Sequence, residues 1–390
     1  MNKIDHNFLL LKRYCEKESF KGYDPFDGLN SKLFKAFPIL STNRFFKLGW
    51  IQFFKRSPVN FRQIAGINKE YNPKGLGLFL SAYCNLYRIN PSTQNLDRIR
   101  FFIDQIKACK LAGYSGACWG YNFDWQSKAF FQPKGTPSVV VTSFVSCAIL
   151  DAYDIIKDEE LLALANSACN FVLKDLKRTY DQDGDFAFSY SPLDSTQVFN
   201  ASLLGARLLC RTYFYSKDPI FIQESQKVVS FVCKHQQANG AWTYSPLSFH
   251  AWIDNFHTGY NLECIYTYQT ISGDQSFQNQ LAKGLDYYLT TFFEDSGLPR
   301  YYNNTKYPVD MHTTAQLLVT LSKMNILNQN KELVNKVLFW SINEMFDQKK
   351  GYFYYYKEKY FTIKIPYMRW TQAWMFLGLS HYQLLSEKEE

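Results

Sequence analysis

The sequence predicts an all-α fold, an (α/α)6 toroid of six helical hairpins with short β-turns at its mouth. Two observations predict this fold. A segment rich in glycine and aromatic residues recurs about every 55 residues, and each repeat combines an almost uncharged helix with a helix that has one charged face. A helix that is apolar all round must be buried on all sides, so the uncharged helices form an inner ring. An open solenoid of TPR or HEAT repeats is the alternative, but those repeats lack an aromatic turn in each unit.

The recurring segment begins with a glycine and continues with two or more aromatic residues. Its copies start at Gly116, Gly184, Gly240, Gly297 and Gly351, and a weaker copy lies near Gly66. The step from Gly116 to Gly184 is longer than the others, which indicates an insertion around residues 123–135. Six units close a ring, so we expect residues 1–390 to form one domain, with residues 1–45 as an N-terminal extension packed on the barrel.

The helices follow from the same pattern, taken in chain order. Inner helices are expected over residues 139–152, 198–209, 259–268, 313–321 and 371–379, where small residues alternate with Leu, Val and Phe. Outer helices are expected over residues 96–112, 159–177, 219–235, 278–292 and 331–345, which are amphipathic. One outer helix shows a start signal, because Asp218 can cap it and Pro219 fits its first position.

Composition limits the possible classes of protein. The 34 Phe, 28 Tyr and 8 Trp residues exclude a disordered chain and exceed what a core requires. No apolar run is long enough to span a membrane and no signal peptide is readable, so a cytoplasmic protein is expected. The nine cysteines are scattered singly without metal-ligand spacing, and no phosphate loop or nucleotide fingerprint occurs. We therefore expect neither a metal nor a cofactor.

The net charge of +8 is concentrated at the start of the chain. Residues 1–110 hold 19 Lys or Arg against 8 Asp or Glu. Such a surface can face nucleic acid, an anionic membrane or an acidic partner. No long basic run or nucleic-acid-binding motif accompanies the charge, so nucleic acid is not expected. A peripheral contact with the inner membrane or with an assembly complex is the expectation that remains, beside a merely solvated basic face.

The polar residues of each repeat lie just before an inner helix. All six clusters should therefore meet at one end of the barrel, where the helix N-termini present unpaired N–H groups and partial positive charge. Asp254 with His257, and Asp310 with His312, occupy equivalent places in two successive units. An Asp just before a His can orient a general base, and paired carboxylates can instead cleave a glycosidic bond. Helix capping alone would also explain each of these Asp residues.

The remaining candidate residues would bind a substrate at the same mouth. Aromatic faces can stack on sugar rings, although packing within the turns is an equal alternative for each of them. Arg369 is the expected clamp for a carboxylate or phosphate. The set comprises Trp119, Tyr121, Asp124, Trp125, Gln126, Asp194, Gln197, Trp242, Trp252, Arg369 and Trp370. Trp242 also belongs to Gln236-Gln-Ala-Asn-Gly-Ala-Trp, a pattern of triterpene cyclase repeats in which Gln and Trp tie a turn to the adjacent helix.

Two segments carry a resemblance to a known family. They are Trp119-Gly-Tyr-Asn-Phe-Asp-Trp-Gln-Ser-Lys with Gly135-Thr-Pro, and Asp254-Asn-Phe-His-Thr-Gly. Here the chain resembles six-hairpin-toroid proteins encoded with capsule, O-antigen and exopolysaccharide biosynthesis genes. The resemblance implies a bacterial protein that acts on surface-polysaccharide sugars or their precursors. It implies no established reaction and no verified catalytic residues.

These observations lead to a first hypothesis, a carbohydrate-active enzyme that acts on an anionic, uronic-acid-like or lipid-linked oligosaccharide. Asp254 or Asp310 would be the general acid or base, and His257 and His312 would be bases or orienting partners. Hydrolysis is placed ahead of elimination and epimerisation. The alternative is a non-catalytic sugar-binding or scaffold protein of a polysaccharide assembly complex. Isoprenoid cyclisation would require an acid or metal motif that the sequence lacks.

Overall fold

The protein is a closed ring of helical hairpins, as predicted. The computed structural model describes residues 3–126 and 131–386. The inner ring consists of α5 (Pro73–Ile89), α7 (Val139–Ile156), α9 (Phe199–Ser216), α11 (Asn255–Ser272), α13 (Met311–Lys323) and α15 (Ala373–Ser386). Each inner helix packs on the next, and α15 packs on α5 to close the ring. The (α/α)6 toroid and the all-α class are therefore confirmed.

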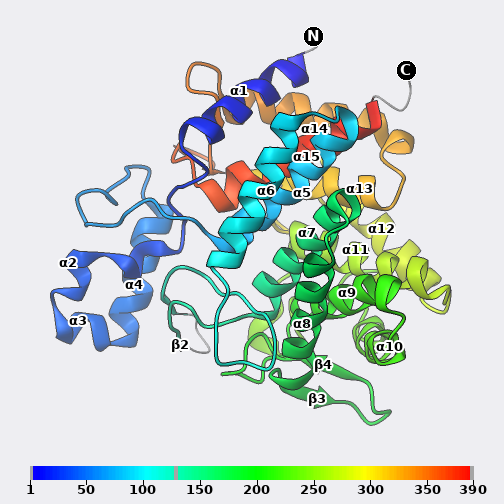
Figure 1. Ribbon diagram of the computed structural model, residues 1–390. Helices are drawn as coiled ribbons and strands as arrows, with labels where there is room; N and C mark the ends of the chain where they lie inside the picture. The colour runs from blue at the N-terminus through cyan, green and yellow to red at the C-terminus, as the bar shows by residue number, and fades with distance from the viewer. Residues whose placement is uncertain (1–2, 127–130, 387–390) are drawn as a thin grey trace.

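The outer ring is completed by the first helix of the chain. Its members are α6 (Thr93–Ala108), α8 (Glu159–Lys174), α10 (Pro219–Lys234), α12 (Gln278–Thr291), α14 (Lys331–Met345) and α1 (Lys3–Lys17). Helix α1 packs on α15 and α14, so the first and last described helices lie side by side (Figure 1). The sixth hairpin thus pairs the first helix of the chain with the last one.

Two inner helices begin earlier than the sequence pattern suggested. Asp254 caps α11 by accepting a hydrogen bond from the His257 backbone N–H, and Asp310 caps α13 in the same way at His312. The polar residues that we expected in the loops therefore form the first helical turns. Before α15 the chain makes a π-helical turn (Met368–Gln372). Of the polar side chains at these helix starts, His257 and His312 line the space at the N-terminal end of the inner helices.

Short antiparallel strand pairs lie in some of the connections from an outer helix to the next inner one. Two of them are β3 (Arg178–Tyr180) with β4 (Phe186–Phe188), and β6 (Phe346–Asp347) with β7 (Tyr352–Phe353). The repeat glycines allow these turns to touch the following outer helix. A Cβ on Gly297 would lie 2.2 Å from the Lys336 carbonyl oxygen on α14, and one on Gly351 would lie 2.8 Å from the Leu10 carbonyl oxygen on α1. The second contact shows α1 in the place of the next outer helix.

Further short elements surround the mouth of the barrel. The predicted insertion contains β1 (Trp125–Gln126) and β2 (Phe131–Gln132). A small sheet of β5 (Val309–Asp310), β8 (Tyr356–Lys357) and β9 (Thr362–Ile363) joins the segments that lead into α13 and α15. The 3-10 turns Asp27–Asn30 and Ser248–His250 precede inner helices, whereas the turn Asn328–Asn330 follows α13, at the opposite end of the barrel. Among the helices of the described residues, α7 alone is long and apolar enough to cross a membrane, and most of it is buried in the barrel.

The segment between α1 and α5 forms a separate lobe beside the barrel. It contains α2 (Lys32–Lys35), α3 (Pro38–Thr42) and α4 (Arg44–Arg56), drawn in blue in Figure 1. Its small core includes Phe34, which stacks on Trp50 with ring centroids 5.1 Å apart. Arg62 Nε donates to Asp27 Oδ1 at 2.7 Å in the buried base of the lobe. We call residues 31–69 the N-terminal lobe.

Candidate functional site

The inner-helix N-termini surround a cavity of about 270 Å³. Its lining includes residues from the start of every inner helix: Lys74, Val140, Asn200, His257, His312 and Trp370. The polar clusters thus converge on one end of the barrel, as the repeat predicted. We call this space the mouth cavity.

Asp254 and His257 form a side-chain pair in the wall of the mouth cavity. Asp254 Oδ2 lies 2.7 Å from His257 Nδ1, and it also accepts a hydrogen bond from Trp252 Nε1 at 3.2 Å. Asp254 is buried, whereas His257 is partly exposed to the cavity. The carboxylate fixes the imidazole ring through Nδ1, which leaves Nε2 available to a ligand. This geometry suits a general base or acid.

His312 makes a different contact, although Asp310 precedes it. His312 Nε2 is hydrogen-bonded to the Tyr260 hydroxyl at 2.8 Å, and its Nδ1 is buried without a partner among the described residues. The ring stacks on Phe256 at a centroid distance of 4.4 Å. Burial, aided by the positive charge of Lys74, holds the His312 pKa well below its usual range. His312 is therefore a neutral imidazole paired with Tyr260.

Asp310 is fully buried behind the cavity wall. Its Oδ1 accepts the His312 backbone N–H at 2.9 Å, and its Oδ2 accepts Trp370 Nε1 at 2.7 Å. Burial raises the pKa of Asp310 to about 7, against the lowering effect of these hydrogen bonds and of Lys55. Asp310 therefore supports Trp370 and His312 from behind and does not itself line the cavity.

The cations of the mouth cavity come from three parts of the chain. Arg369 is buried, and Nε and Nη2 bind both carboxylate oxygens of Asp24 at 2.5 and 2.7 Å. Lys74 lies 4.2 Å from the Phe144 ring centroid, and burial lowers its pKa well below the usual range. Lys55 reaches the cavity from α4. Neither lysine has an ion-pair partner in the described part of the chain, so their N–H groups are better placed than those of Arg369 to hydrogen-bond a ligand.

Aromatic rings form most of the cavity wall. Of the aromatic residues proposed from the sequence, Tyr121, Trp125, Trp252 and Trp370 line it. Trp252 stacks on Tyr244 with centroids 4.6 Å apart and remains 38% exposed, which leaves ring surface for a ligand. The sequence analysis missed the wall residues Phe26, Phe123, Tyr190, Tyr244, Phe256, Tyr260, Tyr301 and Tyr302.

Two tryptophans in the predicted set are packing residues outside the cavity. Trp119 Nε1 donates to the Ile106 carbonyl at 2.9 Å, and Trp242 Nε1 donates to the Val232 carbonyl at 3.0 Å. Both indoles are buried against the end of the preceding outer helix. Their substrate-binding assignment is corrected, because each indole is buried and ties its turn to the C-terminal end of the outer helix.

Four polar residues of the predicted set also lie outside the cavity lining. Asp194 organises its own loop by accepting hydrogen bonds from the backbone N–H groups of Tyr190, Ser191 and Thr196. Asp124 accepts the Lys134 backbone N–H at 2.7 Å. Gln126 is buried in β1, and Gln197 lies in the loop before α9. None of the four lines the mouth cavity, so their assignment as direct ligand contacts is corrected.

Lys74, Tyr260 and Asp24 are the most important residues that sequence reasoning missed. Lys74 had a detectable signal, since it is a charged residue in the first turn of an apolar inner helix. Asp24 belongs to Tyr23-Asp-Pro-Phe-Asp and lies far in sequence from Arg369, so no local pattern links the two. In the described part of the chain, no group of three His, Cys, Asp or Glu side chains could hold a metal ion.

Solved structures share this architecture. Cellobiose 2-epimerase from Bacillus thermoamylovorans matches with a TM-score of 0.63 at 12% identity, over 81% of this chain and 90% of the other. A D-mannose isomerase matches with a TM-score of 0.62 at 11% identity, over 81% and 87%. The GH76 α-mannanase from Bacteroides thetaiotaomicron matches with a TM-score of 0.60 at 11% identity, over 80% and 87%. No protein-family model and no curated protein matches the sequence. The likeness establishes the fold.

Proposed function

We propose that this protein is a carbohydrate-active enzyme that transfers a proton at a sugar carbon, as an epimerase or isomerase does. The observation that carries the proposal is the Asp254–His257 pair, which directs an imidazole nitrogen into an aromatic-walled cavity. Structural neighbours that share this fold are named as a sugar epimerase and a sugar isomerase, which supports this reaction class.

In the proposed reaction, His257 Nε2 removes the proton from the carbon beside the carbonyl group of an open-chain sugar. The C–H electron pair becomes a C=C bond, and the carbonyl oxygen takes up negative charge close to Lys74. A proton returned to the same carbon from the other face regenerates the carbonyl and inverts that carbon. The Tyr260–His312 pair is the second proton-transfer group. No electrons are gained or lost, so the reaction requires no redox partner.

Hydrolysis, which the sequence analysis placed first, is less well supported. Glycosidases use two carboxyl groups that face the scissile bond, one of them as acid. Both oxygens of Asp254 and both oxygens of Asp310 already accept N–H donors. Asp310 in addition lies behind the wall. The imidazole nitrogens are therefore the better candidates for proton transfer.

Deuterium exchange tests the proposal directly. The protein is incubated in D2O with cellobiose and with D-mannose, and the C2 proton signal is followed by NMR. Proton transfer replaces this proton by deuterium and yields an epimer or ketose, whereas glycoside cleavage leaves C2 unlabelled. His257→Asn is expected to abolish exchange, and Gln197→Ala, outside the cavity lining, is the control. Sugar binding without exchange would instead favour the non-catalytic sugar-binding protein.

A lipid-linked sugar is the proposed natural form of the substrate, because the N-terminal lobe has the features of a membrane-binding surface. The lobe holds no Asp or Glu, and its basic residues are Lys32, Lys35, Arg44, Lys47, Lys55, Arg56, Arg62 and Lys69. Its exposed apolar residues include Phe37, Ile39, Phe45, Phe46, Phe53 and Ile64. Apolar side chains among cations favour binding to anionic lipid surfaces. Since Lys55 of this lobe lines the mouth cavity, a docked lobe would place the cavity near the membrane.

Vesicle sedimentation tests the membrane contact. The protein should bind vesicles that contain phosphatidylglycerol and not those of phosphatidylcholine alone, and added salt should weaken binding. Phe45→Ser with Phe46→Ser should release it, whereas Phe214→Ser, also exposed but on α9, should not. Dimerisation through the lobe, seen as a doubled mass that these variants halve, would contradict the proposal. A lipid-linked substrate agrees with the role in surface-polysaccharide synthesis that the resemblance implies. That role and the cytoplasmic location stay predictions.

A further inference from the structure

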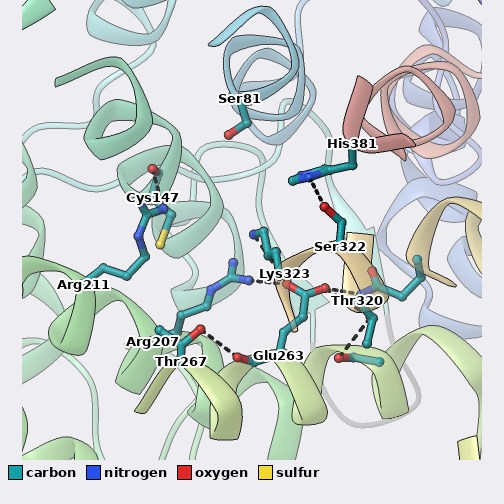
Figure 2. A network of polar contacts seen from close by, with 12 residues as sticks. Ser81, Cys147, Arg207, Arg211, Glu263, Thr267, Thr320, Ser322, Lys323 and His381 are labelled. Carbon is teal, nitrogen blue, oxygen red and sulfur yellow. Dashed lines mark hydrogen bonds and ion pairs between the residues drawn. The ribbon is translucent and has the colours of Figure 1, made fainter. Parts of the chain in front are cut away.

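A second chamber, of about 320 Å³, lies in the barrel beyond the mouth cavity. All six inner helices line it, with Ser81, Asp151, Arg207, Glu263, Lys323 and His381 among the contributors. Figure 2 shows several of these side chains turned toward one common space between the helices. None of them takes part in the proposed sugar chemistry. We call this space the lower chamber.

Three aromatic rings separate the lower chamber from the mouth cavity. Phe144 of α7, Tyr260 of α11 and Trp374 of α15 contact one another with centroid distances of 5.4 to 5.7 Å. Lys74 of the mouth cavity lies near all three rings, while Arg207 of the lower chamber lies 5.1 Å from the Phe144 ring centroid. The two spaces are therefore distinct sites on one axis.

Positive charge exceeds negative charge in the lining of the lower chamber. The lining cations are Arg88, Arg207, Arg211 and Lys323, and the lining anions are Asp151 and Glu263. Arg211 is paired with Asp151 at 2.8 Å, and Arg207 with Glu263 at 2.9 Å. Lys323 Nζ also lies 3.5 Å from Glu263 Oε2. Four cations thus share the two carboxylates of the lining, which leaves two positive charges in excess. Asp154, which lies outside the lining, is shared between Arg88 and Lys157 at 3.8 and 3.7 Å.

Arg207 is a buried guanidinium whose hydrogen bonds are incomplete. It is 2% exposed and donates through Nη1 to Glu263, while its buried Nε has no partner and no described residue accepts from Nη2. In Figure 2 one guanidinium nitrogen points to Glu263 and another is turned away from it. An unmade hydrogen bond at a buried charged group is costly, so an acceptor bound in the chamber would stabilise this guanidinium.

The dipoles of the helix C-termini do not explain why Arg207 carries a buried positive charge. Lysines and arginines often neutralise the partial negative charge of helix C-termini. Arg207 lies in the middle of α9, more than two turns before its end at Ser216, and the dipole effect is confined to the last turn. Arg88 and Lys323 do lie in last turns, so part of their charge is used there. Arg207, whose hydrogen bonds are incomplete, is therefore the cation that no helix dipole explains.

We propose that the lower chamber is a binding site for a phosphate-type dianion, either inorganic phosphate or the phosphoryl group of a small metabolite. Arg207 would be the central ligand, and Arg88 and Lys323 would complete the charge balance. The Ser322–His381 pair, joined at 2.9 Å between Oγ and Nδ1, supplies neutral hydrogen-bonding groups around the same space, whereas the Ser81 hydroxyl already donates to Asp151 Oδ2 at 2.6 Å. Two surplus positive charges match one dianion. This site is independent of the proposed sugar reaction.

Calorimetric titration with inorganic phosphate at constant ionic strength tests the site. Saturable binding is expected for phosphate and not for chloride, and a parallel arm compares D-mannose 6-phosphate with D-mannose to separate a metabolite from free phosphate. Arg88→Gln with Lys323→Gln should weaken binding about tenfold or more. Both side chains are about one-third exposed, at 35% each, so the variant is expected to fold. Arg100→Gln with Lys336→Gln, on the outer helices, is the charge-matched control.

Three outcomes of these titrations would overturn the proposal. Phosphate that binds no better than chloride would show that the chamber holds only water, and equal affinity in the Arg88 and Lys323 double variant would place the phosphate elsewhere. The mouth cavity is the main competing location, since Lys55 and Lys74 lie there. Lys74→Met should therefore leave phosphate affinity unchanged. Loss of binding in Lys74→Met would reassign the anion to the mouth cavity.

Discussion

Asp254 holds His257 at two points, with Oδ2 2.7 Å from the imidazole Nδ1 and Oδ1 3.0 Å from the backbone N of the same residue. The carboxylate therefore caps α11 and orients the ring at once. Asn is as good a helix cap as Asp, but it cannot stabilise a charged imidazole. We expect Asp254→Asn to change the free energy of unfolding by less than about 1 kcal/mol and to slow C2 exchange about 100-fold.

A double variant shows whether the two residues act as one unit. His257→Asn alone should abolish exchange, and adding it to Asp254→Asn should bring the rate no lower than His257→Asn alone, because residues that act together are not additive. The measurement is the deuterium exchange rate at saturating sugar. An Asp254→Asn variant with the full exchange rate would remove the orienting role and leave Asp254 as a cap only.

Asp310 should make stability depend on pH. Burial raises its pKa to about 7 in the folded protein, from an ordinary value of 3.8. Between about pH 4 and 7 the folded state holds a proton that the unfolded state has lost, so the contribution is present at low pH and disappears as pH rises through this window. The difference in unfolding free energy between the wild type and Asp310→Asn should change by up to about 1.4 kcal/mol per pH unit.

Urea unfolding of both proteins at several pH values between 4 and 8 gives this difference. Asp27, whose pKa burial raises to about 6, has an effect of the same sign, but it is present in both proteins and cancels. A difference that stays constant over the whole range would show that Asp310 is ionised in the folded state.

Trp119→Phe and Trp242→Phe should affect stability and leave sugar binding unchanged. Each removes an indole N–H that donates to a carbonyl at the end of an outer helix. The expected loss is about 1 kcal/mol in unfolding free energy for each. Trp252→Phe should instead lower sugar affinity and leave the free energy of unfolding unchanged, since this indole lines the mouth cavity. Thermal unfolding and sugar titration of the three variants separate the two roles. A fall in sugar affinity in Trp242→Phe would restore its assignment to the binding site.

The ring of hairpins could be predicted because its signal is local and repeated. Each inner helix shows its buried character along its own length, and each turn shows its glycine and aromatics. The sixth outer helix could not be found in this way. Helix α1 pairs with α15 from the opposite end of the chain, so no repeat spacing connects them. The segment looked like an extension because its partner helix comes last in the sequence.

The mouth cavity was located from the sequence, but its individual roles were not. Asp254 and Asp310 look alike in sequence, yet one side chain faces His257 and the other Trp370. A single residue of spacing separates the two cases, because Asp254 precedes its His by three positions and Asp310 by two. Arg369 could be predicted as a cation at the mouth, whereas its ion pair with Asp24 depends on tertiary packing alone.

The contact between the Gly351 turn and α1 gives a last prediction, on the closure of the ring. Gly351 and Gly184 both have left-handed backbones, with φ of +76° and +83°, but only Gly351 lies against another helix. Gly184→Ala should cost about 1 to 2 kcal/mol for the backbone conformation alone. Gly351→Ala should cost roughly 1 to 3 kcal/mol more, because its Cβ would lie 2.8 Å from the Leu10 carbonyl oxygen. Chemical unfolding of both variants measures this difference. Equal losses would mean that α1 does not press on this turn in solution.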